Sequence, residues 1–208
     1  MLRRMTTIEI LGLAASLSLL AGWRLYAAVL ATGLAVRFGV PELAGGLPAS
    51  LAGLHVLANP FVLGIAALGT TAEFFADKVP WLDSVWDALH TLVRPIGGAM
   101  LALAVVSPDN AALGVVTFLL GGSAALAAHA AKAGTRAVVN ASPEPVSNVV
   151  ASVAEDGITA AGLWLVLTHP QWAAALAAVL GGIVLLLLWW ASRLLGPAWR
   201  KWRAAWGE

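Results

Sequence analysis

Long apolar runs recur from one end of this chain to the other, and they restrict its fold more than any other feature. Hydrophobic residues make up 60% of the 208 residues and charged residues only 11%, so polar side chains are too few to cover a soluble globule. Several runs reach the ~20 residues that a helix needs to cross a bilayer. The period-two alternation of a transmembrane β-barrel is absent. We therefore expect an all-α integral membrane protein.

We interpret residues 1–208 as one membrane domain. Turn-forming residues divide this domain into about six spans. We place these spans at residues 8–38, 61–78, 82–106, 111–139, 146–167 and 172–195. The first is longer than one crossing requires, so it is tilted, broken or extends beyond the bilayer, and Arg24 lies in its middle. A short apolar helix at 49–58 cannot cross and is expected to be interfacial or re-entrant.

Basic residues predict the orientation of the spans. With six crossings, nine Lys and Arg side chains lie at one membrane face and only Arg37 at the other, and the positive-inside rule identifies the basic face as the cytoplasm. Both termini would then be cytoplasmic. Residues 195–208 place Trp199, Trp202 and Trp206 on one helical face beside basic residues, so this tail is expected to be an amphipathic anchor, with residues 196–208 at the interface.

Charge is concentrated in Glu73 to Pro95. Four of its side chains are spaced 4, 3 and 4 residues apart: Asp83, Asp87, His90 and Arg94. On an α-helix this spacing forms one stripe. The stripe would descend from the cytoplasmic interface towards the membrane midplane, where polar groups are unfavourable and usually line a pathway or site.

The polar spacing of this region recurs later in the chain. The positions after Pro80 match those after Pro145, and the preceding helices match as well. We therefore predict two repeated helical hairpins, at residues 60–106 and 111–168, which turn at the same membrane face and are related by an axis along the membrane normal. The stripe of the first hairpin should face polar residues of the second, namely Asn148, Ser152 and Glu155, while Lys132 and Arg136 balance its acids.

These patterns favour a small membrane transporter, channel or lipid-translocating protein. Its ligand site or ion pathway would lie between the hairpins, open to the cytoplasm. The predicted site residues are Arg24, Glu73, Asp77, Asp83, Asp87, His90, Arg94, His129, Lys132, Arg136, Asn140, Asn148, Ser152, Glu155 and Asp156.

The expected partners are the lipid bilayer and a small ion, solute or lipid head group; nothing indicates nucleic acid. Imidazole and buried carboxylates could bind a cation or carry protons, with Asp87, His90 and Glu155 as candidates. The basic side chains could instead hold an anionic group such as a phosphate. A bundle of this size could form a homodimer.

Two alternatives remain open. One is a metal-dependent membrane enzyme acting on a lipid or isoprenoid phosphate, with Asp83, Asp87 and His90 as metal ligands, although Arg94 would repel a cation. The other is a structural scaffold held by a buried ion-pair network. The chain has no cysteine, no Ser-His-Asp set and no phosphate loop, so we assign no catalytic residue and no cofactor.

Three segments resemble a bacterial inner-membrane family catalogued as a domain of unknown function. They are Ala-Glu-Phe-Phe-Ala-Asp-Lys-Val-Pro-Trp-Leu-Asp-Ser-Val-Trp-Asp followed by Arg-Pro-Ile-Gly-Gly-Ala at 94–99, the signature at 129–136 with 147–156, and residues 22–26. The resemblance implies a multi-pass protein of the bacterial inner membrane, and it implies no activity.

Overall fold

The computed structural model describes residues 5–39, 49–140 and 146–206 and is helical throughout these parts, which confirms the predicted all-α fold. The elements are α1 (Thr7–Phe38), η2 (Ala49–Ala58), α2 (Pro60–Ala76), α3 (Pro80–Val106), α4 (Ala111–Val139), α5 (Val146–Thr168), η3 (Pro170–Trp172) and α6 (Ala173–Trp206). Five helices are long and apolar enough to cross a membrane, or six if η2 and α2, bent by 74° at their junction, form one broken span. The protein is therefore a multi-pass membrane protein.

The turn residues identified in the sequence become helix starts. The Asn110 side chain caps α4 by accepting a hydrogen bond from the Leu113 amide at 2.9 Å, and Asn59 caps α2 in the same way at the Phe61 amide. Proline stands at the first position of α2 and of α3, where its missing N–H leaves no bond unmade. These local signals explain why the predicted bounds of the middle helices agree well with those in the structure.

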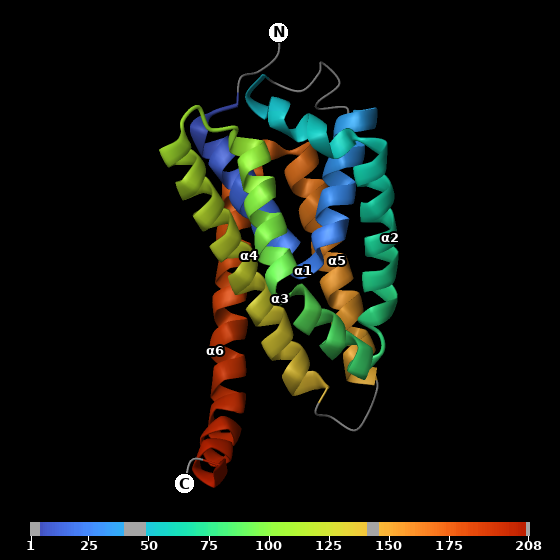
Figure 1. Cartoon of the computed structure of the whole chain (residues 1–208), viewed down its shortest axis with the longest axis vertical. Coiled ribbons are helices and arrows are strands. Elements are labelled where there is room, and N and C mark those ends of the chain that lie inside the picture. The colour runs from blue at the N-terminus through green and yellow to red at the C-terminus, as the bar shows by residue number, and fades with distance from the viewer. Residues whose placement is uncertain (1–4, 40–48, 141–145, 207–208) are drawn as a thin grey trace.

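The first helix is broken at Arg24. Its backbone angles there, φ −139° and ψ 78°, are not helical. Leu13 and Thr32 line the same small cavity, although they would lie about 28 Å apart in one continuous helix with a rise of about 1.5 Å per residue. The chain therefore turns back at Arg24, and α1 is a re-entrant hairpin whose tip lies inside the bundle (Figure 1).

This reversal changes the path of the whole chain. The α2–α3 turn and the adjoining ends of α4 and α5 lie at one end of the bundle, here called the turn end, as the two predicted hairpins require (Figure 1). Both ends of α1 and the short helix η2 lie at the opposite end. The helix ends Thr7 and Trp206 therefore lie at opposite ends of the bundle (Figure 1). The prediction that both termini share one side assumed that residues 8–38 cross once, whereas α1 is broken at Arg24.

The short helix η2 and the last helix α6 agree in part with the bounds predicted from the sequence. The apolar segment 49–58 is a separate 3₁₀ helix with the predicted bounds. The final span is not followed by a separate tail, because α6 continues as one helix to Trp206. The predicted aromatic face at Trp199, Trp202 and Trp206 lies outside the described side chains, and the last two residues of the tail lie outside the described residues.

Close packing of the α1 hairpin depends on small residues. A Cβ built on Gly22 would overlap the Ala125 carbonyl of α4, and one built on Gly12 would overlap the backbone at Ala174 of α6. Glycine at such positions lets membrane helices approach to backbone contact. The first half of α1 is accordingly surrounded by the other helices, and Leu17 and Leu20 are fully buried.

The path of α1 can be tested by labelling, since the chain has no cysteine of its own. Single variants Thr7→Cys and Phe38→Cys should react with a membrane-impermeant maleimide from the same side of sealed vesicles. Val79→Cys, in the α2–α3 turn, should react from the other side. Labelling of Thr7→Cys and Phe38→Cys from opposite sides would mean that α1 crosses the membrane once.

Candidate functional site

Eight charged side chains are buried together where α1, α2, α3 and α4 meet, and we call them the charged cluster. None is more than 5% exposed. They comprise four acids and four bases: Glu73, Asp77, Asp83, Asp87, Arg24, Arg94, Lys132 and Arg136. Charges inside a membrane protein are tolerated when they are paired, and this equal composition allows it.

Arg94, fully buried on α3, joins two of the acids. Its Nη2 donates to Glu73 Oε1 of α2 at 2.7 Å, and its Nη1 donates to Asp87 Oδ1 of the same helix at 2.7 Å. His129 of α4 completes this group, with its Nδ1 at 2.7 Å from Arg94 Nη1. The predicted stripe positions Asp87 and Arg94 thus bind each other.

Asp77, in the turn after α2, is the second centre of the cluster. Its carboxylate forms ion pairs with Arg24 at the tip of α1 and with Lys132 of α4, the latter at 2.7 Å. Burial opposes ionisation of Asp77, but Lys132 and Arg24 hold the pKa of this carboxyl below its ordinary value. The sequence-based expectation that an acid of the first hairpin meets a base of the second holds for Asp77 and Lys132.

The polar residues of α5 contact Arg136 and also Arg24. Arg136 of α4 donates to Glu155 Oε2 at 2.8 Å and to Asn148 Oδ1 at 2.6 Å. Arg24 lies 2.8 Å from Asp156 Oδ1 and within 3.5 Å of the Ser152 hydroxyl. The tip of α1 therefore reaches α5.

The α3 stripe does not face the α5 stripe, which corrects that prediction. Asp83 accepts a hydrogen bond from Asn140 of α4 at 3.0 Å. His90 contacts the Tyr26 hydroxyl of α1 at 3.0 Å and the Trp86 carbonyl at 2.8 Å. The physical reason is that side chains of α1 and α4 lie between α3 and α5.

The candidate metal ligands are not brought together. Asp83, Asp87 and His90 bind Asn140, Arg94 and Tyr26, respectively. In the described parts of the chain, no group of three His, Asp or Glu residues is arranged to hold a metal ion. The geometry therefore gives the metal-dependent enzyme no support.

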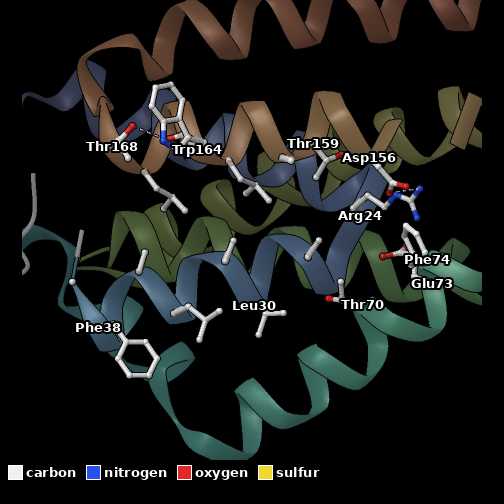
Figure 2. A pocket seen from close by; sticks show the side chains of 18 residues that line it. Arg24, Leu30, Phe38, Thr70, Glu73, Phe74, Asp156, Thr159, Trp164 and Thr168 are labelled. Atoms are coloured by element: carbon white, nitrogen blue, oxygen red, sulfur yellow. Dashed lines mark hydrogen bonds and ion pairs between the residues drawn. The ribbon is translucent and has the colours of Figure 1, made fainter. Parts of the chain in front are cut away.

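A groove of about 620 Å³ borders the charged cluster, between α2 and α5 and over the second half of α1 (Figure 2). Most of its lining is apolar: Ala27, Leu30, Ala31, Leu34, Ala35, Phe38, Phe74, Ala160, Leu163, Trp164 and Leu167. One end is charged, where Arg24, Glu73 and Asp156 lie (Figure 2). The other end lies at Phe38 and Thr168, away from the turn end.

Sequence reasoning found the charged end of this groove and missed its walls. The groove is lined by α2 and α5, which belong to the two different predicted hairpins. The groove extends away from the turn end, however, whereas we expected the site to open there. Thr70 of α2 and Thr159 of α5 also line the groove, and neither is among the site residues predicted from the sequence.

Two buried polar atoms at the charged end have no hydrogen-bond partner among the described residues. They are Glu73 Oε2 and Arg24 Nε. Buried polar atoms in folded proteins are nearly always paired, so unpaired atoms beside a groove indicate a place where a polar ligand group could bind. The charged end therefore combines a paired framework with free binding capacity.

Comparison with known proteins adds a family and nothing more specific. No curated protein and no solved structure matches the chain. One family does match, over residues 11–193, a range that includes the charged cluster and the groove. The chain therefore belongs to the family described as domain of unknown function (DUF4126).

Proposed function

We propose that this protein moves an amphipathic lipid across the membrane along the groove of α1, α2 and α5. The observation that carries the proposal is the shape and chemistry of that groove, which is apolar for most of its length and ends at Arg24, Glu73 and Asp156. An acyl chain can lie against the apolar wall while the head group meets the charged end. An ion channel selects its ion through carbonyl or charged groups along the pore, and this groove carries charged side chains at one end.

The charged cluster makes this arrangement energetically reasonable. A head group is unfavourable in hydrocarbon, so a translocating protein must supply polar contacts at membrane depth. Arg24 is held at that depth because α1 breaks there, and irregular backbone inside a membrane is tolerated where it is buried in protein or lines a cavity. Discontinuous helices form the substrate sites of many transporters for the same reason.

A scaffold is the second candidate, and one observation favours it. Glu73, Asp77 and Asp87 are each ion-paired within the cluster, as a locked network requires. Ion pairing alone, however, does not account for the groove or for the unpaired Glu73 Oε2 that lies beside it. We therefore assign the network the role of holding the charged end of the groove in place.

We further propose that the turn end faces the cytoplasm. Lys78 and Arg193 lie towards this end, and α6 continues past it with Arg200, Lys201 and Arg203, whereas Arg37 lies at the other end. In a bacterial inner membrane, the groove would then point its charged end towards the cytoplasmic leaflet. A lipid of that leaflet has the same polarity, with its head towards the turn end and its chain towards the midplane.

The test is a leaflet-exchange assay in proteoliposomes. Ethanolamine-headed lipids with a fluorescent label on one acyl chain should become accessible to an impermeant reducing agent in both leaflets when the protein is present, and only in the outer leaflet of protein-free vesicles. A soluble dye trapped inside should stay inside. The proposal would be contradicted if the labelled lipid of the inner leaflet stayed as protected from the reducing agent as it is in protein-free vesicles. Leakage of the trapped dye would instead indicate a channel.

A further inference from the structure

An ammonium group of the protein itself already sits beside the charged end of the groove. Lys78, in the turn after α2, places its Nζ 3.3 Å from the centroid of the Phe74 ring. The same Nζ lies 3.4 Å from Asp156 Oδ2 and 3.4 Å from the Ser152 hydroxyl, and it donates to the Phe74 carbonyl at 3.1 Å. An aromatic face with a carboxylate beside it is a standard protein site for an ammonium cation.

This ammonium seat, made by Phe74, Ser152 and Asp156, opens onto the groove. Phe74 and Asp156 both line the groove, and Figure 2 shows them at its charged end with Glu73. Glu73 is 1% exposed and its Oε2 has no partner among the described residues, so a second carboxylate oxygen is free to accept there. Arg94 pairs with Glu73 Oε1 and Arg24 pairs with Asp156 Oδ1. This leaves Glu73 Oε2 and Asp156 Oδ2, the latter now held by Lys78, for a cationic head group.

Lys78 can leave the seat more easily than the members of the charged cluster can leave their partners. Its side chain and that of Asp156 are 25% and 29% exposed, whereas Lys132 and Asp77 are fully buried. Partly exposed ion pairs contribute little stability, and a lysine side chain is long and flexible. The lysine could therefore turn towards solvent at the turn end while the rest of the site stays in place.

We infer that the groove selects an amphiphile with an ammonium head group, and that Lys78 occupies the ammonium seat until such a head group displaces it. This inference rests on the proposed function, because it names the class of lipid that the groove takes. Lys78 then acts as a tethered competitor for the ligand.

The inference is tested by lipid retention. Wild-type protein in nanodiscs with equal amounts of ethanolamine-headed and glycerol-headed phospholipid is released into a mass spectrometer, and the retained lipids are counted. Ethanolamine-headed lipid should be retained preferentially. Lys78→Ala should raise its retention by roughly 2–5-fold, the range expected for losing one exposed cation–π competitor. Lys78→Arg should behave like the wild type, and Asp156→Asn and Phe74→Leu should each reduce the preference.

Several outcomes would overturn the ammonium seat. Equal retention of the two lipids in the wild type would do so, as would no gain in Lys78→Ala. Retention of free ethanolamine without lipid would show a small-molecule site instead of a lipid site. None of these outcomes affects leaflet exchange, which is measured separately in liposomes. Selective retention without any leaflet exchange would instead overturn the proposed function and leave the seat intact.

Discussion

Replacing Arg94 with methionine should lower the free energy of unfolding by about 3–5 kcal/mol, the usual consequence of removing one partner from a buried charge pair. Arg94 is fully buried and binds Glu73 and Asp87 at 2.7 Å each. Without it, Glu73 loses its ion-pair partner at membrane depth, and Asp87 keeps only Lys132, at 3.6 Å. Equilibrium unfolding in mixed micelles with increasing sodium dodecyl sulfate, followed by tryptophan fluorescence, measures the loss.

Two further variants make this prediction specific. Arg193→Met removes an exposed arginine from α6 and should change stability by no more than about 0.5 kcal/mol. A triple variant with Arg94→Met, Glu73→Gln and Asp87→Asn should recover most of the lost stability, because neither acid is left charged without its arginine. The remaining bases keep acid partners, namely Arg24 with Asp156, Lys132 with Asp77 and Arg136 with Glu155. If the single and triple variants were equally unstable, the loss would come from packing of the Arg94 side chain, and the role given to the charge pairs would be wrong.

Local signals made most helix bounds and part of the charged cluster predictable. Asn110 and Pro80 mark helix starts through capping and backbone restriction, effects that act within one turn. The i+4 spacing of polar residues revealed which side chains share a buried face. An ion pair such as that of Asp77 with Lys132 could be predicted from the sequence, because the two hairpins carry opposite charges at related positions.

The break in α1 could not be predicted from the sequence around it. No proline stands near Arg24, and the apolar pattern continues on both sides. The break depends on distant partners, since Arg24 binds Asp77 of the α2–α3 turn and Asp156 of α5. Gly22 contributes by letting the tip lie against the α4 backbone. Both effects exist only after the bundle has assembled.

The groove was hidden for a similar reason. Its walls are ordinary apolar membrane residues, and its space exists because Ala27, Ala31 and Ala160 are small where three helices meet. Alanine at these positions is indistinguishable in sequence from alanine at any lipid-facing position. A cavity between helices is a property of packing, whereas periodicity reports only which face of each helix is polar.

A matched pair of tryptophan variants separates the groove from the lipid-facing surface. Ala160 and Ala161 are neighbours on α5 and both are exposed, but only Ala160 lines the groove. A tryptophan at Ala160 would occupy the space that the account gives to an acyl chain, and the chain could then no longer lie in the groove. A tryptophan at Ala161 would point into lipid and leave the groove unchanged.

The rate of lipid exchange between the leaflets of proteoliposomes, compared for these two variants, tests the account most directly. Ala160→Trp should slow exchange by about tenfold or more, since each factor of ten corresponds to about 1.4 kcal/mol on the barrier. Ala161→Trp should exchange lipid at the wild-type rate, and both variants should unfold as the wild type does. Wild-type exchange in Ala160→Trp would show that lipid does not move along this groove.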